Sequence, residues 1–552
     1  MKKYIWLILL ITISIKGQNL DSLYNLLISR NISVKGTTTP TTIAGHQNDK
    51  CGFSLYGNIK SHFHEYSKEQ QESIAKITQR APLQKSTVSP SGYFRIHYDT
   101  TGTNKPQYDN LDIETGIYEL AVAFDSAYTF EIDILGYGSP PSDNGIGGDD
   151  KYDIYVKNLN PGLYGQTFWE EKISYIEIDN SFNENEGYNS YGIQAARATA
   201  AHEFHHAIQV GAYIFKGEDT YYYELTSTAF EEFVYDDVND YYAYMSSFLR
   251  NTSNRFDSNT GYNLAVWNIF LNERFKSVDV MEGHNIVKRS WELMRDKNYR
   301  AIVAIANSVQ EFGHSFSKTF NEFGDWLYFT NNNAVDGMYF EEAASYPSIR
   351  STYTIELNSS ESSLNIQAEP TSLNYLQYSD NTGGDANLVM AVISNSGINA
   401  STIIENPVDI NVSLANFGFD DSKSINDTYY SKITTESNGL VNDSYIINNI
   451  VYSEDLNPVT IDFVYPQPFR YDIYSIVNIP TYADVTNTAE LKIYSSDMDL
   501  IYSGKKTIFA NDNIVVGWDG LDNSGRKLAS GVYIYITQAN NKIKKGKLVI
   551  FN

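Results

Sequence analysis

The chain has 552 residues, 42% of them hydrophobic, and carries 41 basic against 67 acidic side chains for a net charge of −26. A chain of this length is too long for a single hydrophobic core and predicts about three or four domains. The acidic balance excludes nucleic acid as an expected partner, because nucleic-acid-binding proteins concentrate positive charge. Such acidity favours solubility outside the cell.

The first residues, MKKYIWLILLITISIKGQN, have the layout of a secretory signal. Lys2 and Lys3 precede an apolar run of 12 residues from Tyr4 to Ile15, and the small Gly17 follows. That run is shorter than the roughly 20 residues that a helix needs to cross a bilayer. We therefore expect a signal peptide over residues 1–17, no transmembrane segment in the mature chain, and a secreted or cell-surface protein.

Residues 18–89 are polar, with mixed charge and weak periodicity, which is typical of a propeptide. This segment holds Cys51, the only cysteine, so no disulfide forms within the chain. Because thiolate is a strong zinc ligand, Cys51 is a candidate to fill the open position of a downstream zinc site and keep an enzyme latent. The alternative interpretation is an unpaired thiol with no metal role.

The texture changes from about residue 90, where a domain over residues 90–348 is expected. The runs YFRIHY, KYDIYVKNL and ISYIEID predict strands. Between them, Ser142 to Asp153 form a loop of glycines and carboxylates, SDNGIGGDDKYD. Oxygen ligands along such a turn suit Ca²⁺, but the spacing does not match the twelve-residue calcium loop. Calcium is the weaker interpretation, and an ordinary acidic turn is favoured.

An alanine-rich, helix-forming stretch contains HEFHH from His202 to His206. Residues four apart share one helix face, so His202 and His206 point the same way. The spacing satisfies H-E-x-x-H, in which two imidazoles bind Zn²⁺ and the intervening Glu203 serves as general base toward the water that the metal activates. His205 is offset from this face and is expected to be a packing residue.

A zinc hydrolase needs a third protein ligand and one open position. The longer H-E-x-x-H-x-x-G-x-x-H pattern is excluded, because the chain has Gln209 and Ala212 at the required places. The following helical stretch, YELTSTAFEE, offers Glu224, which lies 18 residues after His206, as the favoured ligand.

Glu231 is the rival to Glu224, and whichever of the two does not bind the metal can orient a histidine through its second ring nitrogen. The acidic residues that remain in this region are expected to form a solvated face: Glu232, Asp236, Asp237 and Asp240.

Helical patterns continue through VNDYYAYMSSFL, GYNLAVWNIFLNERF and NIVKRSWELMRD. From about residue 350 the sequence alternates and is punctuated by Gly, Asn, Ser and Asp, which is typical of a β-sandwich. Near the end, Val532, Ile534 and Ile536 share one face of a strand. The fold class predicted is multidomain: an α+β domain, then β domains over residues 349–460 and 461–552.

The combination of HEFHHAIQ, ELTSTAFEE and VNDYYAY, preceded by GYFRIHYDTTG, resembles a group of secreted bacterial metallopeptidases of the glutamate-zincin type. The resemblance covers roughly residues 50–345 and implies a zincin-like fold. It implies that His202, His206 and Glu224 are zinc ligands and that Glu203 is the catalytic base. Glutamate zincins often add a downstream His or Tyr that steadies the tetrahedral intermediate. No motif identifies that residue here, and His284 is a candidate for it or a structural histidine.

The C-terminal stretches YPQPFR, AELKIYSSDMDLIYSG, GWDGLDNSGRKLASGVYIYI and KKGKLVIFN are similar to the sorting domain of type IX secretion cargo, an immunoglobulin-like sandwich. The usual Pro-Asn-Pro near its start is replaced by Pro466-Gln467-Pro468. This resemblance implies type IX secretion machinery as a partner and the cell surface or medium as the destination.

Two functional classes follow. The first is a secreted zinc endopeptidase that acts on protein or peptide substrates with Glu203 as general base. The alternative is a non-catalytic cell-surface binding or adhesion protein with an idle zincin domain. The presence of Glu203 favours the enzyme, because an idle site has no need of a base between its ligands.

Overall fold

A computed structural model describes residues 20–31, 49–276, 279–335, 337–357, 361–380, 388–395, 398–399, 402–403, 406–416, 431–437, 445–452, 464–471, 474, 476–482, 488–495, 499–510, 514–539 and 542–552. The expected signal peptide over residues 1–17 lies outside these ranges. Within them the chain is a multidomain α+β protein with several separate sheets. No described helix combines the length and apolar character needed to cross a bilayer.

A five-stranded mixed sheet opens the first domain. Its order is β1 (Lys85–Val88), β2 (Phe94–Tyr98), β3 (Tyr152–Lys157), β5 (Ile173–Asp179) and β4 (Gly165–Glu170). The central strands β2, β3 and β5 run parallel, whereas β4 pairs antiparallel to β5 and forms one edge. The predicted strands are present, and β3 and β5 are buried almost throughout, as central parallel strands are. Strand β1 lies inside the expected propeptide range, yet it pairs with β2.

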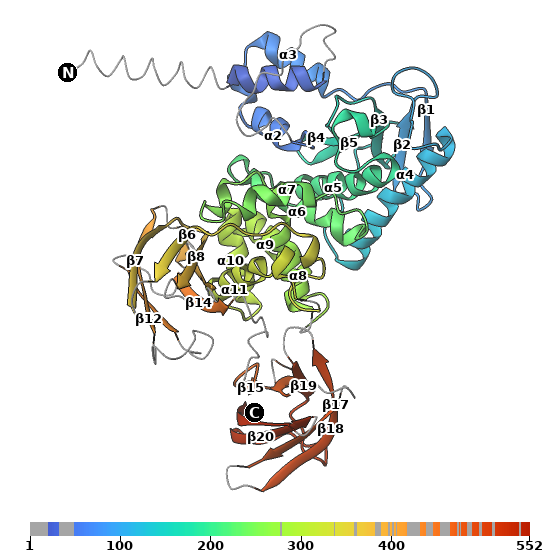
Figure 1. The fold of residues 1–552 in the computed structure, drawn as a ribbon. Coiled ribbons are helices and arrows are strands. Elements are labelled where there is room, and N and C mark those ends of the chain that lie inside the picture. Colours follow the sequence, from blue (N-terminus) through green and yellow to red (C-terminus); the bar gives the residue numbers. More distant parts are fainter. Residues whose placement is uncertain are drawn as a thin grey trace, which may run out of the picture.

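Two long helices pack together beside this sheet (Figure 1). Helix α4 (Ile113–Tyr128) begins at Asp112, whose carboxylate accepts hydrogen bonds from the backbone N–H groups of Glu114 and Thr115. Helix α5 (Gly192–Ala212) contacts both β5 and β4. Its small alanines allow close packing, and most of its residues are buried.

The helices that follow form the second half of the domain. They are α6 (Thr220–Val234), α7 (Tyr242–Leu249), α8 (Ala265–Phe275), α9 (Glu282–Lys297), α10 (Ala301–Glu311) and α11 (Phe316–Tyr328). A continuous aromatic-rich core joins them to the sheet. The sequence predicted α6 to α9 in outline but gave no sign of α10 and α11.

Three helices precede the sheet: one over residues 20–31, then α2 (Phe53–Ser61) and α3 (Lys68–Ile77). They share a small core of their own, formed by Leu23, Leu26, Leu27, Leu55, Ile59, Tyr66 and Ile74. Phe53 and Tyr56 of α2 belong instead to the large core of the first domain. Figure 1 shows α2 next to β4, with which it is in contact.

The rest of the described chain is β structure. A four-stranded sheet contains β6 (Tyr353–Leu357), β8 (Ser372–Asp380), β9 (Leu388–Asn395) and β14 (Tyr445–Tyr452), and a three-stranded sheet contains β7 (Glu361–Ala368), β12 (Val408–Asn416) and β13 (Ser431–Ser437). The pair β10 (Ile398–Asn399) and β11 (Thr402–Ile403) lies apart from both. Leu373 and Tyr375 of β8 belong to the large core, so this region packs firmly on the helices.

The C-terminal domain has one seven-stranded sheet with a separate core. Its order is β15 (Phe469–Arg470), β21 (Lys542–Phe551), β20 (Gly531–Ala539), β17 (Thr488–Tyr494), β18 (Leu500–Ala510), β19 (Ile514–Trp518) and β16 (Val477–Pro480). Along β18 the pairing changes from β17 to β19, which curls the sheet back over itself. On β20 the buried face carries Tyr533 and Tyr535, whereas Val532 is 49% exposed.

Candidate metal centre

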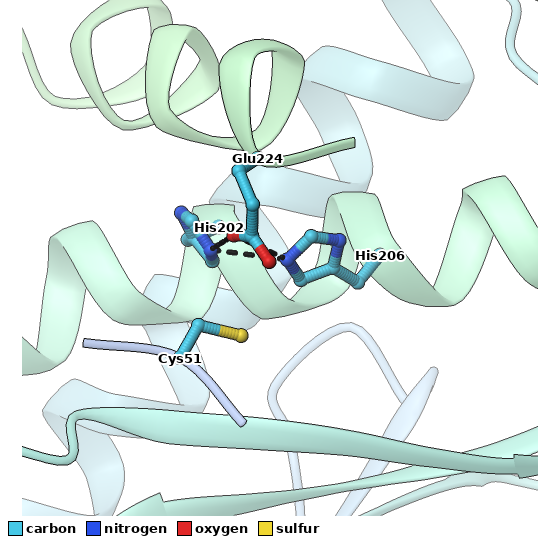
Figure 2. Close-up of side chains that lie close together, drawn as sticks. All are labelled: Cys51, His202, His206 and Glu224. Atoms are coloured by element: carbon cyan, nitrogen blue, oxygen red, sulfur yellow. Dashed lines mark hydrogen bonds and ion pairs between the residues drawn. The ribbon is translucent and has the colours of Figure 1, made fainter. Parts of the chain in front are cut away.

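Helix α5 carries two histidines whose imidazoles converge. The Nε2 atoms of His202 and His206 lie 3.1 Å apart, and both side chains are almost fully buried. One helical turn separates the two residues, which is the arrangement expected from their four-residue spacing. Figure 2 shows the two rings facing a common space between α5 and the neighbouring helix.

Helix α6 brings a carboxylate to the same space. Oε2 of Glu224 lies 3.3 Å from Nε2 of His202 and 3.4 Å from Nε2 of His206. Atoms placed about 2.0–2.2 Å from a tetrahedral zinc are separated by roughly 3.3–3.6 Å. The two distances to Glu224 lie in this range, and the two imidazole nitrogens, 3.1 Å apart, lie slightly below it. Oε2 of Glu224 is buried and, apart from its ion pairs with the two histidines, has no partner among the described residues. This orphaned oxygen, with two imidazole nitrogens beside it, is a donor set that fits zinc.

The far sides of both rings are fixed by acceptors. Nδ1 of His202 donates to Oε1 of Glu231 over 2.7 Å, because a carboxylate can only accept. Nδ1 of His206 lies 2.8 Å from Oε1 of Gln209, whose amide nitrogen is engaged by Tyr223 O. With the proton on Nδ1, each Nε2 lone pair is free for a metal. Glu231 therefore contacts the outer nitrogen of a histidine, whereas Glu224 contacts the two nitrogens that face the common space.

Glu203 lies beside the group on α5 and is fully buried. Thr167 of β4 donates to its Oε2 over 2.7 Å, while Oε1 has no hydrogen-bond partner in the described part of the chain. The backbone at Gly165 approaches so closely that an added Cβ would lie 2.9 Å from Cγ of Glu203. The edge strand thus holds one oxygen of Glu203 and leaves the other available.

The fourth member of the group comes from far away in the sequence. Cys51 Sγ and one ligand atom each from His202, His206 and Glu224 all lie within 4.8 Å of one another. The thiol approaches from the side opposite α6 (Figure 2). Among the described residues, this is the one group of three or more His, Cys, Asp or Glu side chains gathered so closely. Such a buried cluster could hold a metal ion.

The charges of the group are strongly coupled. Burial opposes protonation of His202, but hydrogen bonds to Glu224 and Glu231 outweigh it and raise its pKa to about 9. Burial favours the neutral form of Glu224, yet the charges and hydrogen bonds of His206 and His202 lower its pKa well below the usual range. Burial, reinforced by the charges of Glu203 and Glu224, raises the pKa of the Cys51 thiol. A bound divalent cation would oppose the protonation of His202 and of the Cys51 thiol, because it competes with protons on imidazole and deprotonates a coordinating thiol, and it would keep Glu224 ionised.

Two other histidines stand outside the group. His205 is fully buried, is hydrogen-bonded through Nδ1 to Glu131 at 2.6 Å and stacks on Phe230, in line with the packing role expected for it. His284 on α9 lies edge-on to Phe130 and Phe233, and burial lowers its pKa to about 4. The surroundings of His284 are those of a core residue.

The expectation of a solvated acidic face after Glu231 is wrong in part. Asp236 and Asp237 are exposed, but Glu232 and Asp240 are buried. Asp240 accepts a hydrogen bond from Lys50 at 2.7 Å and others from Tyr164 and Ser190, so its burial is compensated. Lys50 is too distant in the sequence for this pairing to be foreseen.

Three carboxylates of the glycine-rich loop over residues 142–153 pair with arginines from outside the loop. Arg80 forms ion pairs with Asp143 and Asp153, and Asp149 pairs with Arg95. These cations occupy oxygens that a calcium ion would need. The loop thus has the contacts of the favoured acidic turn.

Sequence reasoning missed several side chains around the group. Tyr262 stacks on His202 with ring centroids 6.1 Å apart, and its buried hydroxyl has no hydrogen-bond partner among the described residues. Ser54 donates to Oε1 of Glu224 over 2.5 Å, and Phe53 stacks on His206. Tyrosine is abundant in this chain, with 44 residues, so no local signal singled out Tyr262.

Comparisons with known proteins found a similar solved structure of low identity. No protein-family model matches the chain, and no curated protein matches it. A solved structure of PorZ, described as an essential bacterial surface component of the type-IX secretion system of Porphyromonas gingivalis, is similar at 13% identity over 33% of this chain and 23% of PorZ, with a TM-score of 0.14. The chain thus spans less than a quarter of the length of that protein.

Proposed function

We propose that this protein is a secreted zinc endopeptidase with a zincin-like catalytic domain. The observation that supports it best is the buried trio of His202, His206 and Glu224, whose ligand atoms lie 3.1–3.4 Å apart. Bound by these residues, zinc would supply a Lewis acid that polarises a peptide carbonyl and acidifies a water molecule. Glu231 and Gln209 hold the two imidazoles in the tautomer that this binding requires.

Glu203 is the proposed general base. Its Oε1 is buried and without a hydrogen-bond partner among the described residues, so it is available to take a proton from the attacking water and pass it to the leaving amine. Thr167 fixes the other oxygen and thereby the orientation of the carboxylate. This arrangement is why an active enzyme is favoured over an idle binding domain.

Tyr262 is the proposed stabiliser of the oxyanion that develops on the substrate carbonyl. Its ring stacks on the ligand His202, and its hydroxyl is a buried donor with no partner in the described chain. A donor held ready in a water-poor site stabilises developing negative charge strongly. His284, the other candidate for this role, packs among phenylalanines instead.

The destination of the protein is also a proposal. The signal-like first residues and the similarity of the C-terminal domain to type IX sorting domains favour export and delivery to the cell surface or medium. That domain has its own hydrophobic core, separate from the core beside the metal centre. Such independence suits a sorting domain that does not take part in catalysis.

The test of the catalytic proposal pairs zinc content with casein cleavage. Both are measured on the full chain and on the chain cut before Lys85, each with and without Glu203→Gln. We expect about one zinc per chain in all forms and cleavage by the cut form only when Glu203 is present. In the cut chain, the His206→Ala variant should lose zinc, because His202 and Glu224 are then the two remaining protein ligands and cannot close the site.

Zinc without cleavage in any form would favour the non-catalytic binding protein. Unchanged zinc content after His206→Ala would contradict the proposed zinc ligands. Retained cleavage after Glu203→Gln would show that another group is the general base.

A further inference from the structure

The segment around Cys51 lies along the free edge of the catalytic sheet. Tyr164 N donates to Lys50 O over 2.7 Å and Gly52 N donates to Gly165 O over 3.0 Å, so Cys51 pairs with Gly165 in a parallel bridge. Gly165 begins β4, the edge strand that also holds Glu203. An extended peptide that added to this edge would need the same backbone groups. The segment therefore occupies the place where a substrate backbone would bind.

The side chains of this segment fill the space around the metal ligands. The Phe53 ring lies parallel to the His206 ring with centroids 3.9 Å apart and packs against Trp169, Phe215 and Tyr223. Ser54 hydrogen-bonds to Glu224. Phe53 is fully buried, so the apolar pocket that it fills is closed to any other side chain.

Buried charges tie the same segment to the second carboxylate of α6. Lys50 Nζ lies 2.6 Å from Glu231 Oε2 and 2.7 Å from Asp240 Oδ2, and all three side chains are almost completely shielded from water. Glu231 in turn accepts from His202. Lys50 thus compensates buried negative charge next to the ligands, which makes the docked position of the segment specific.

The N-terminal segment, residues 20–31 and 49–84, also supplies an anchor for this stretch. Its three helices share their own small core, separate from that of the first domain. Arg30 donates to Asp49 O over 2.6 Å, and Asn31 accepts from Gln166 of β4 at 2.7 Å. A unit with a small core of its own can hold the stretch Lys50–Ser54 in the site without being part of the sheet, while Phe53 and Tyr56 of α2 pack in the large core.

We propose that the N-terminal segment keeps the enzyme latent, with Cys51 as the fourth ligand of the zinc and the stretch Lys50–Ser54 in the place that a substrate backbone would take along β4. This inference rests on the proposed function, since it requires zinc at His202, His206 and Glu224. With zinc held there, the Cys51 thiol would give up its proton to solvent and its sulfur would serve as the fourth ligand, in the place that water needs for hydrolysis. On release, water takes that position and the thiol is protonated again.

Activation then requires removal of the segment. The chain between α3 and β1, residues 78–84, has no helix or strand, and Gln79 and Gln84 are exposed. A cut there separates the anchor from the sheet without touching β1, which pairs with β2 from Lys85 onward. Loop tips of this kind are preferred sites of proteolytic cleavage.

The first test uses the intact wild-type chain and needs no activity. X-ray absorption at the zinc edge should show one sulfur at about 2.3 Å together with nitrogen and oxygen ligands. Cys51→Ala should lose the sulfur and keep the zinc, and the control Ser73→Ala, on α3 in the same segment, should retain both. A zinc-loaded wild-type chain with no sulfur at this distance would overturn the proposal.

The second test measures peptide hydrolysis by the uncut chain. A closed state with an open population of about 0.1–10% predicts a gain of about 10- to 1,000-fold when closure is lost. Cys51→Ala should show part of this gain. Gly52→Val should show it too with the thiol intact, because the added side chain would strike Gln166, 2.5 Å from the position of its Cβ. Ser73→Ala should show none.

The two tests separate this inference from the proposed function. A zinc–sulfur bond in a protein that stays inactive after cutting would support Cys51 as a ligand and contradict the peptidase. An uncut wild-type chain that hydrolyses peptides as fast as its cut form would contradict latency and support the peptidase.

Discussion

Replacement of Glu224 and of Glu231 by alanine should weaken zinc binding to different extents. Structural zinc sites with four ligands bind with about 10–16 kcal/mol, so the share of one ligand is roughly 2.5–4 kcal/mol, or about 10²- to 10³-fold in affinity. Glu224 presents an orphaned oxygen 3.3 and 3.4 Å from the two imidazole nitrogens, so its loss should have an effect of this size.

Glu231 should have the smaller effect. It acts through the 2.7 Å hydrogen bond to Nδ1 of His202 and the ion pair with Lys50. Loss of such an outer partner typically weakens metal binding by about 10- to 100-fold, which is about 1.4–2.7 kcal/mol. In Glu231→Ala, Lys50 retains Asp240 as a partner, which limits the loss of zinc affinity.

The assay is competition for zinc against a chromophoric chelator of known affinity, at fixed pH, with the full chain. Glu218→Ala is the control, because Glu218 is an exposed glutamate just before α6. We expect the highest zinc affinity for the wild type and Glu218→Ala, a lower affinity for Glu231→Ala, and the lowest for Glu224→Ala. A larger loss for Glu231→Ala would exchange the roles of the two carboxylates and refute the ligand set.

Three further predictions concern Tyr262, His284 and the C-terminal domain. Tyr262→Phe should lower kcat by about 10²- to 10³-fold with zinc content unchanged, since one oxyanion donor is lost, and an unaltered kcat would remove that role. Because burial lowers the pKa of His284 from 6.5 to about 4, the folded protein binds fewer protons than the unfolded chain between these values. The free energy of unfolding should therefore fall by up to about 3 kcal/mol from pH 6.5 to 4, and calorimetry of His284→Gln should show a flatter dependence. A chain ending near residue 460 should keep zinc, and cleavage in vitro once the N-terminal segment is removed, but fail to reach the surface of its native host, and cell fractionation that finds normal delivery would contradict the sorting role.

The part of the candidate site that could be predicted is the part encoded locally. His202, Glu203 and His206 lie within one helical turn, so their spacing alone predicts that they share a face. Glu224 follows after a loop of ordinary length. The sequence did not decide whether Glu224 or Glu231 is the third ligand. The structure brings Glu224 to the two Nε2 atoms and Glu231 to Nδ1 of His202.

The part that could not be predicted depends on contacts between distant segments. Cys51 meets His202 across 151 residues of chain, and the sequence could offer only two interpretations of the thiol. The burial of Asp240 depends in the same way on Lys50. Strand β4, GQTFWE, is buried over five of its six residues and so lacks the alternation that marks a half-exposed strand.

Alternation can also indicate a strand without its orientation. Val532, Ile534 and Ile536 predict a strand, and β20 is present, but its buried face carries Tyr533 and Tyr535. An aromatic residue buries more apolar surface than a valine, so the tyrosines prevail in the core although their hydroxyls are polar.

The rate of casein cleavage per bound zinc, measured on the cut chain and on its Glu203→Gln form, decides whether this protein is a zinc peptidase with Glu203 as its base. Glutamine keeps the shape of the side chain and its contact with Thr167 but cannot accept the proton of water. We predict equal zinc content and a rate lower by about 10²- to 10⁴-fold, the usual contribution of a general base. Equal rates for the two forms would contradict the account.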